Sequence, residues 1–141
     1  MQLLQLLQQD ASRSNQALAE MAGVSAATAL RRVRRLVEAG VIERLVAIVS
    51  PQAAGLAAGL QALVEVTLDR QGNEAQEAFE QRVVAEDAVQ QCYRVSPGPD
   101  FVLIVHARDM PGYLALAQRL FTSDANVRNV KAYFSVRRAK F

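Results

Sequence analysis

The sequence predicts an α+β protein, with an N-terminal winged helix-turn-helix followed by a ferredoxin-like βαββαβ domain. Two helical patterns meet around Gly23, and a β-rich segment follows them, an order typical of the winged motif. From residue 60 onward, strand and helix patterns follow one another as β-α-β-β-α-β. The domain boundaries that we expect are 1–49 for the winged motif, 50–59 for a linker and 60–141 for the second domain.

The first domain is expected to contain three helices and a wing. Serines precede the second and third helices, where a side-chain oxygen can cap the helix, and glycines follow both helices. The wing is expected at 41–49, a β-rich segment with a polar break at Glu43-Arg44, and Ser50-Pro51 ends it. The expected helices are 2–9, 15–21 and a third that follows Ser25 and runs to about residue 38, with caps at Ser14 and Ser25 and ends at Gly23 and Gly40.

The second domain is expected to follow the linker at 50–59, because residues 52–59 are small and glycine-spaced. Residues 101–107 are densely apolar, which predicts a central strand. Pro97-Gly98-Pro99 predicts a turn before that strand, and Pro111 is well placed at the start of the last helix. The expected strands are 62–68, 89–95, 101–107 and 127–136, and the expected helices are 73–85 and 111–122.

Composition excludes several classes of protein. The chain of 141 residues is 51% hydrophobic, which is sufficient for a packed core and argues against global disorder. A single cysteine excludes a disulfide within the chain, and no apolar run approaches the ~18 residues of a membrane span. With no secretion signal in view, we expect a cytoplasmic protein without a membrane partner. Because each half is small, we also expect the chain to form a homo-oligomer.

The third helix of the first domain carries four arginines. On a helical wheel at about 100° per residue, one arc is apolar and the opposite arc is cationic and hydroxylated. Arg34 lies at the flank of the cationic arc. The apolar arc holds Ala26, Ala29, Leu30, Val33, Leu36 and Val37. The opposite arc holds Ser25, Thr28, Arg31, Arg32 and Arg35.

This charge pattern favours double-stranded DNA as the partner. Like charges at this spacing repel one another by a few tenths of a kcal/mol per pair, which a polyanion would relieve. Small residues at the helix start, Ala26 among them, would let the backbone approach base edges, while Ser25, Thr28 and the arginines bond bases or phosphates. The alternative is a solvated or partner-binding basic face. Basic residues also dominate the C-terminal end, where residues 128–141 carry five cations and no acid, so nucleic acid is expected to meet the two ends of the chain.

Short motifs in both halves resemble the Lrp/AsnC (leucine-responsive/asparagine regulator, feast/famine) family of transcription regulators. The resemblance covers essentially the whole chain, and its most specific part is the order of the two domains. In the first half, the motifs are Leu18-Ala19, Val24-Ser25, Leu30-Arg31-Arg32-Val33, Leu36, Gly40-Val41-Ile42, Pro51 and Gly55-Leu56. In the second half, they are Val64-Glu65-Val66, Val95-Ser96, Asp100-Phe101, Asp109-Met110 and Tyr113.

The resemblance implies sequence-specific DNA binding by dimers that assemble further into tetramers or octamers on the nucleoid, and an amino acid or related metabolite as effector, bound between dimers. The implied effector residues are Pro97, Gly98, Asp100, Met110 and Tyr113. The family's glycine in the loop before Asp100 is here Pro97. Two prolines in that loop restrict the backbone and remove N–H donors, so we expect altered effector specificity or loss of amino-acid binding. The chain also departs from the family at its start, which is about ten residues shorter before Leu3, and in the segment Asp10-Ala11-Ser12-Arg13.

From the residues alone, Asp100 could serve as a loop cap or bind an effector ammonium, while Met110 and Tyr113 favour local packing. The single histidine, His106, and the single cysteine, Cys92, are expected to be structural. We expect no catalytic residue, no metal and no cofactor. Two other functions stay open: a tetrapyrrole decarboxylase, since some sirohaem decarboxylases resemble this family, and an assembly module that modulates a partner regulator.

Overall fold

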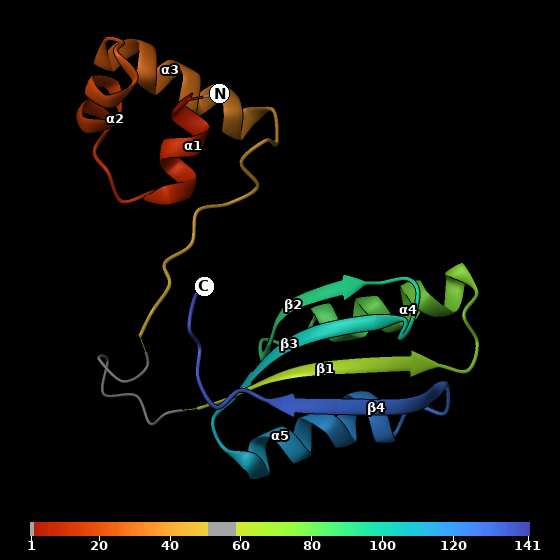
Figure 1. Ribbon diagram of the computed structural model, residues 1–141. Helices are drawn as coiled ribbons and strands as arrows, with labels where there is room; N and C mark the ends of the chain where they lie inside the picture. Colours follow the sequence, from red (N-terminus) through yellow and green to blue (C-terminus); the bar gives the residue numbers. More distant parts are fainter. Residues whose placement is uncertain (1, 51–58) are drawn as a thin grey trace. The chain divides into compact units, whose positions relative to one another are not determined.

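The computed structural model describes residues 2–50 and 59–141 and divides into two compact units, Met1–Val49 and Ser50–Phe141 (Figure 1). Each unit has a hydrophobic core of its own. Apart from its two ends, the linker expected at 50–59 lies outside the described residues. The same holds for Pro51 and Gly55-Leu56, which carry part of the family resemblance.

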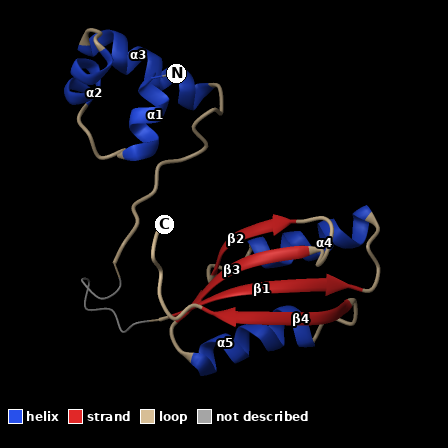
Figure 2. Cartoon of the chain, in the orientation of Figure 1, coloured by secondary structure: helices blue, strands red, loops and turns tan. Residues whose placement is uncertain are grey.

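Three short helices build the first unit (Figure 2): α1 (Gln2–Gln9), α2 (Asn15–Ala22) and α3 (Ala26–Glu38). The capping predictions are confirmed. Ser14 Oγ accepts a hydrogen bond from the Ala17 amide at 3.1 Å, and Ser25 Oγ accepts one from the Thr28 amide at 3.2 Å. Gly23 ends α2 with a φ of 65°, which glycine adopts without strain.

The core of the first unit is small. Ala29 of α3 is fully buried where α3 packs on α2, and its short side chain allows the two helices to approach closely. After α3, the amides of Val41 and Ile42 both donate to the Leu36 carbonyl, at 2.9 and 3.0 Å, and this turn directs Ile42 into the core. The buried core residues are Leu3, Leu7, Leu18, Ala19, Ala29 and Ile42.

The predicted wing is wrong for the described residues, because positions 41–50 contain no strand. Apart from Ile42, the apolar side chains here are largely exposed; Val46, for example, is 66% exposed. A two-stranded ribbon that packs on nothing is marginally stable at best. The Glu43-Arg44 break also lacks the glycine or asparagine that a tight hairpin turn requires. The β-rich composition of this segment therefore does not produce a hairpin within one chain.

The second unit has the predicted βαββαβ order. Its four strands form one antiparallel sheet in the order β2-β3-β1-β4. The predicted last helix is continuous to Thr122 but widens into a π-helical end, η1. The elements are β1 (Leu60–Leu68), α4 (Asn73–Val84), β2 (Val89–Arg94), β3 (Phe101–Ala107), α5 (Met110–Ala117), η1 (Gln118–Thr122) and β4 (Val127–Phe134).

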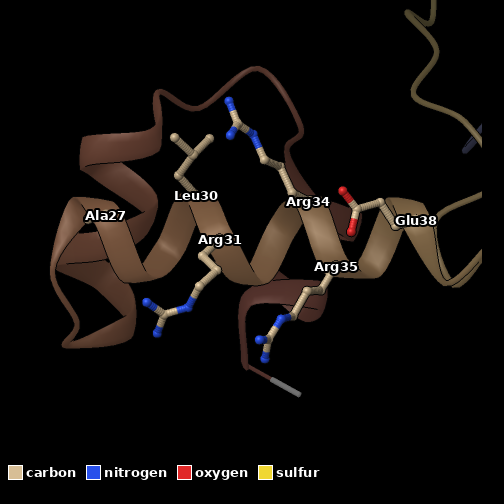
Figure 3. Close-up of a pocket in the computed structure, with 6 residues that line it drawn as sticks. All are labelled: Ala27, Leu30, Arg31, Arg34, Arg35 and Glu38. Atoms are coloured by element: carbon tan, nitrogen blue, oxygen red, sulfur yellow. The ribbon is translucent and has the colours of Figure 1, made fainter.

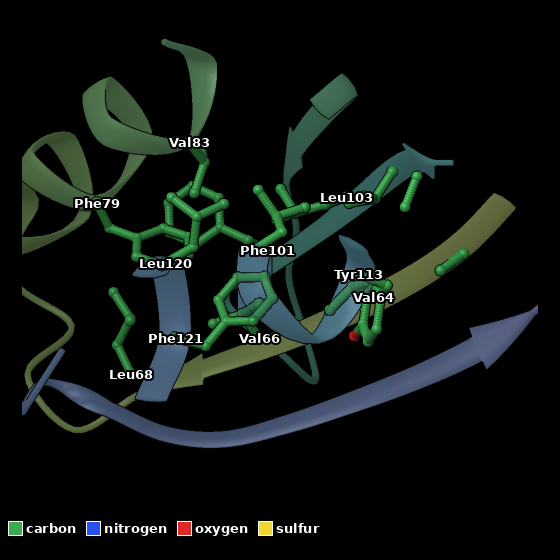
Figure 4. Packing of buried hydrophobic residues seen from close by; sticks show 14 residues of the cluster. Val64, Val66, Leu68, Phe79, Val83, Phe101, Leu103, Tyr113, Leu120 and Phe121 are labelled. Carbon is green, nitrogen blue, oxygen red and sulfur yellow. The ribbon is translucent and has the colours of Figure 1, made fainter. Parts of the chain in front are cut away.

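Both long helices of this unit cover the same face of the sheet (Figure 4). Alternate residues of β1 and β3, such as Val64 and its cross-strand partner Leu103, are fully buried under Phe79 of α4 and Leu120 of η1. The intervening residues point to the other face, which no helix in the described residues of this unit covers. Leu63 on that face is 43% exposed. One sheet face is thus core, and the other is open.

The last strand ends earlier than predicted, at Phe134 rather than residue 136. The Ser135 amide still donates to the Gln61 carbonyl at 2.8 Å, and beyond it residues 136–141 form an extended tail without regular structure. None of the helices in the described ranges is both long enough and apolar enough to cross a membrane.

Candidate nucleic-acid interface and effector loop

The side of α3 that faces away from the core is cationic (Figure 3). Because Ala29, Val33 and Leu36 pack against the core, the opposite side of the helix is left free. In Figure 3, Arg31 and Arg35 extend along one flank of this side and Arg34 along the other. A shallow groove of about 280 Å³ runs along it, lined by Ala27, Leu30, Arg31, Arg34, Arg35 and Glu38. We call these six residues the outward face.

The arginines of α3 have no acidic partner among the described residues, whereas four of the eight arginines of the second unit are ion-paired. In the second unit, Arg94 pairs with Glu80 at 2.8 Å, and Arg128 pairs with Asp69 at 2.7 Å. Arg82 and Arg119 are also paired there, with Asp124 and Glu86. Within the described part of the chain, no ion pair involves any of the four α3 arginines, although the helix itself ends in Glu38. Their charge is therefore available to an external anion.

The start of α3 uses its hydroxyl groups internally. Ser25 Oγ accepts from the Thr28 amide and donates to Thr28 Oγ1 at 2.9 Å, so its one proton is used, while the Thr28 proton remains available. Asn15 Nδ2 donates to the Ala26 carbonyl at 2.8 Å and thereby fixes the start of α2 to the first turn of α3. No local pattern predicts this positioning contact, because the two residues lie eleven positions apart.

The helical wheel placed the two faces of α3 imperfectly. Leu30 and Val37 were expected in the core, but they are 40% and 50% exposed. Within the described part of the first unit, α1 and α2 are the helices that pack on α3, so the buried sector is narrower than the apolar arc. Arg34, expected at the flank, lines the outward groove, and Arg32 is exposed but does not. The helical wheel took the middle of the whole apolar arc as the inward direction. With Ala29 as the inward direction, the wheel places Arg34 on the outward side.

Asp100 ties the predicted effector loop to the sheet. Its side chain is buried, with Oδ2 accepting from the Leu68 amide at 2.7 Å and from Gln71 Nε2 at 3.4 Å. Its own amide donates to the Val66 carbonyl at 2.9 Å. The cap-like role for Asp100 is therefore the one that the structure shows. Pro97 and Gly98 lie exposed in the same loop, and Gly98 has a φ of 114° that favours glycine.

The other two predicted effector residues lie beyond the opposite end of β3. Met110 and Tyr113 follow the C-terminal end of this seven-residue strand, whereas Asp100 precedes its start. At about 3.4 Å per residue the ends are about 20 Å apart, so one chain does not bring the five residues together. Tyr113 is buried against Phe134, with ring centroids 5.0 Å apart, and burial raises the pKa of its phenol. Met110 is 41% exposed.

Comparisons with known proteins now decide the family. Residues 61–141 match the Lrp/AsnC ligand binding domain, and residues 1–43 match a winged helix-turn-helix DNA-binding domain. The chain belongs to the Lrp/AsnC family of DNA-binding transcription regulators. Members of this family are regulators rather than enzymes, which removes the decarboxylase alternative.

Relatives of this Lrp/AsnC regulator match it over nearly its whole length. It is 40% identical over 132 residues to an uncharacterised HTH-type transcriptional regulator of Haemophilus influenzae, covering 94% of this chain and 77% of that protein. It is 34% identical to the leucine-responsive regulatory protein of Rhizobium meliloti, covering 99% and 88%. A transcriptional regulator of Neisseria meningitidis, solved in complex with L-Met, superposes with a TM-score of 0.83 at 27% identity, covering 99% and 89%.

Proposed function

We propose that the outward face of α3 reads the operator of this regulator in the major groove, with Arg31, Arg34 and Arg35 as its principal contacts. The observation that carries the proposal is that all three guanidiniums line one groove on the free side of the helix and have no acidic partner among the described residues. Guanidinium groups bond guanine edges and phosphates in this way. Ser25, Ala26, Thr28 and Arg32 complete the contact at the helix start and flank.

A double substitution tests the assignment of this face. Arg31→Gln with Arg35→Gln removes two cations from the outward face, and Arg70→Gln with Arg108→Gln removes two exposed arginines of the second unit that have no ion pair in the described chain. Fluorescence anisotropy on an operator selected from random duplexes should show severe loss of binding for the first pair only. Equal affinities for the two double variants would overturn the assignment.

We further propose that the open face of the sheet pairs with a second copy, and that dimers assemble further. Leu63, Tyr93 and Tyr133 are all more than 40% exposed on this face, and Leu63 lies opposite both Ile104 and Tyr133 in the strand register. Leu63→Glu should reduce the mass measured by light scattering. Leu114→Glu, on α5 at 59% exposure, is the control and should leave the mass unchanged. A full-mass assembly with Leu63→Glu would exclude this face.

The effector is proposed to be an amino acid or related metabolite that binds where chains of the assembly meet. The separation of Asp100 from Met110 and Tyr113 within one chain supports a shared site, and the Neisseria regulator was solved with L-Met. A thermal-shift screen of the twenty amino acids tests this, since a ligand of the folded state raises the melting temperature with concentration. No shift across the panel would mean that the Pro97-Gly98-Pro99 loop has lost amino-acid binding. We place the regulator on chromosomal DNA in the cytoplasm.

A further inference from the structure

We propose that the C-terminal tail, residues 135–141, is a second DNA contact that binds the phosphate backbone without reading sequence. The tail contains Arg137, Arg138 and Lys140 and no acidic side chain. The proposal rests on DNA binding by the family. It does not depend on which residues of α3 read the operator.

The cations of the tail have no acidic partner among the described residues. In the preceding strand, Arg128 pairs with Asp69, and Lys131 hydrogen-bonds Tyr133, which together with Glu65 raises the pKa of Lys131. Beyond Ser135, by contrast, no ion pair is formed within the described ranges. Three like charges within four positions repel one another in the free protein, and a polyanion would relieve that repulsion.

Packing does not account for the tail either. Val136 is completely exposed, and a cavity of about 470 Å³ separates residues 135–141 from the open sheet face at Gln61 and Ile104. Arg138 lies over the Phe141 ring, 5.6 Å from its centroid, and no ion pair in the described ranges takes up its N–H groups. Those N–H groups are the ones that bind phosphate oxygens.

The root of the tail is fixed while its cations are free to adapt. The Ser135 amide bonds the Gln61 carbonyl at 2.8 Å and holds the tail at the end of β4. Phosphate contacts need charge and reach but no exact geometry, because they position the protein on DNA and carry no sequence information directly. DNA is the polyanion that a member of this family binds, so we assign the phosphate backbone as the partner.

The test uses the full chain and a 30-base-pair duplex of mixed sequence. The tail variant is Arg137→Gln with Arg138→Gln, and the matched control is Arg70→Gln with Arg108→Gln. Each phosphate contact contributes about −0.9 to the slope of log K against log salt. Loss of two such contacts should therefore make the slope of the tail variant shallower by about 1.8 per bound subunit. Between 50 and 200 mM salt, the wild type should then lose about 12-fold more affinity than the tail variant, and the control should match the wild type.

Two outcomes would overturn the proposal. An unchanged slope for the tail variant would show that these cations are only solvated. A changed slope together with a smaller assembly by light scattering would show that the tail binds another copy of the chain. If the tail also contacts the selected operator, affinities for operator and mixed-sequence DNA should fall by the same factor. The α3 assignment is judged separately, by the loss of operator preference in the α3 variants.

Discussion

Arg34 and Arg32 differ by two positions and offer a sharp test of how α3 faces DNA. With the fully buried Ala29 as the inward direction, about 100° per residue places Arg31 about 160° and Arg34 about 140° away from it. Arg32 lies only about 60° from that direction. The two substitutions Arg34→Gln and Arg32→Gln remove the same charge from the same helix and differ mainly in direction.

The expected magnitudes follow from this placement. A guanidinium that contacts a guanine edge contributes about 1–3 kcal/mol, so Arg34→Gln should weaken operator binding by about 5-fold to 150-fold. Arg32→Gln should weaken it by less than about 3-fold, because a side chain on the flank reaches at most a phosphate. Both arginines are exposed and have no ion pair in the described chain, so each variant should stay within about 0.5 kcal/mol of the wild type in stability.

The assay is anisotropy with a labelled operator duplex, selected by the wild-type protein from a random pool. Circular dichroism and urea unfolding of both variants establish that the fold is intact. If Arg32→Gln weakens binding as much as Arg34→Gln or more, α3 does not present its outward face to the groove, and the argument from burial is refuted.

Three further predictions concern the second unit. Asp100→Ala should lower the free energy of unfolding by about 1–3 kcal/mol in urea titrations, because the buried Leu68 amide loses its acceptor. Asp100→Asn keeps an acceptor oxygen and should largely restore the stability. Equal losses of stability in the two variants would contradict the cap role of Asp100. Burial opposes ionisation of Asp124, but the hydrogen bond from Arg82 outweighs it and lowers the pKa of this carboxyl group below the ordinary 3.8. The ionised carboxylate therefore stabilises the fold above pH 3.8, and this stabilisation is lost as the pH falls through the lowered pKa. Melting temperatures should therefore fall less steeply below pH 3.8 in Arg82→Gln than in the wild type, and parallel curves would exclude this pair as the cause. Burial raises the pKa of the Cys92 thiol, so it should react with iodoacetamide at pH 7 much more slowly in the native protein than in urea, and equal rates would show that the site is open.

The sequence predicted elements where local signals agree with tertiary packing. The serine caps and Gly23 are local chemistry, and the 101–107 run is apolar on both faces, which located the central strand although only one of its faces is covered by helices. The prediction of the wing was wrong because β propensity at 41–49 does not show whether a surface exists for the strands to pack on. No residue pattern could show that, apart from Ile42, this segment lies largely exposed in the described part of the chain.

The sequence predicts which kind of partner α3 binds, but not which side of α3 faces that partner. Four arginines on one helix indicate an anionic partner, yet which of them faces outward depends on how much of the helix α1 and α2 cover. Leu30 is apolar and lies on the outward face for that reason. The effector residues that the resemblance implies lie in two segments of the chain, and the length of β3 sets the distance between those segments.

The anchoring of Asp100 has a consequence for how this regulator can diversify. Side chain and amide of this one residue hold the loop to β1, and Pro97 and Gly98 at the tip are exposed and belong to neither core. Pro97 can therefore change through evolution at little cost to folding, whereas Gly98 is constrained by its φ of 114° and Asp100 by its hydrogen bonds to β1. Under the proposed effector role, a loop built in this way would let descendants of one ancestral fold acquire different metabolite preferences, and we expect the prolines of this chain to alter that preference.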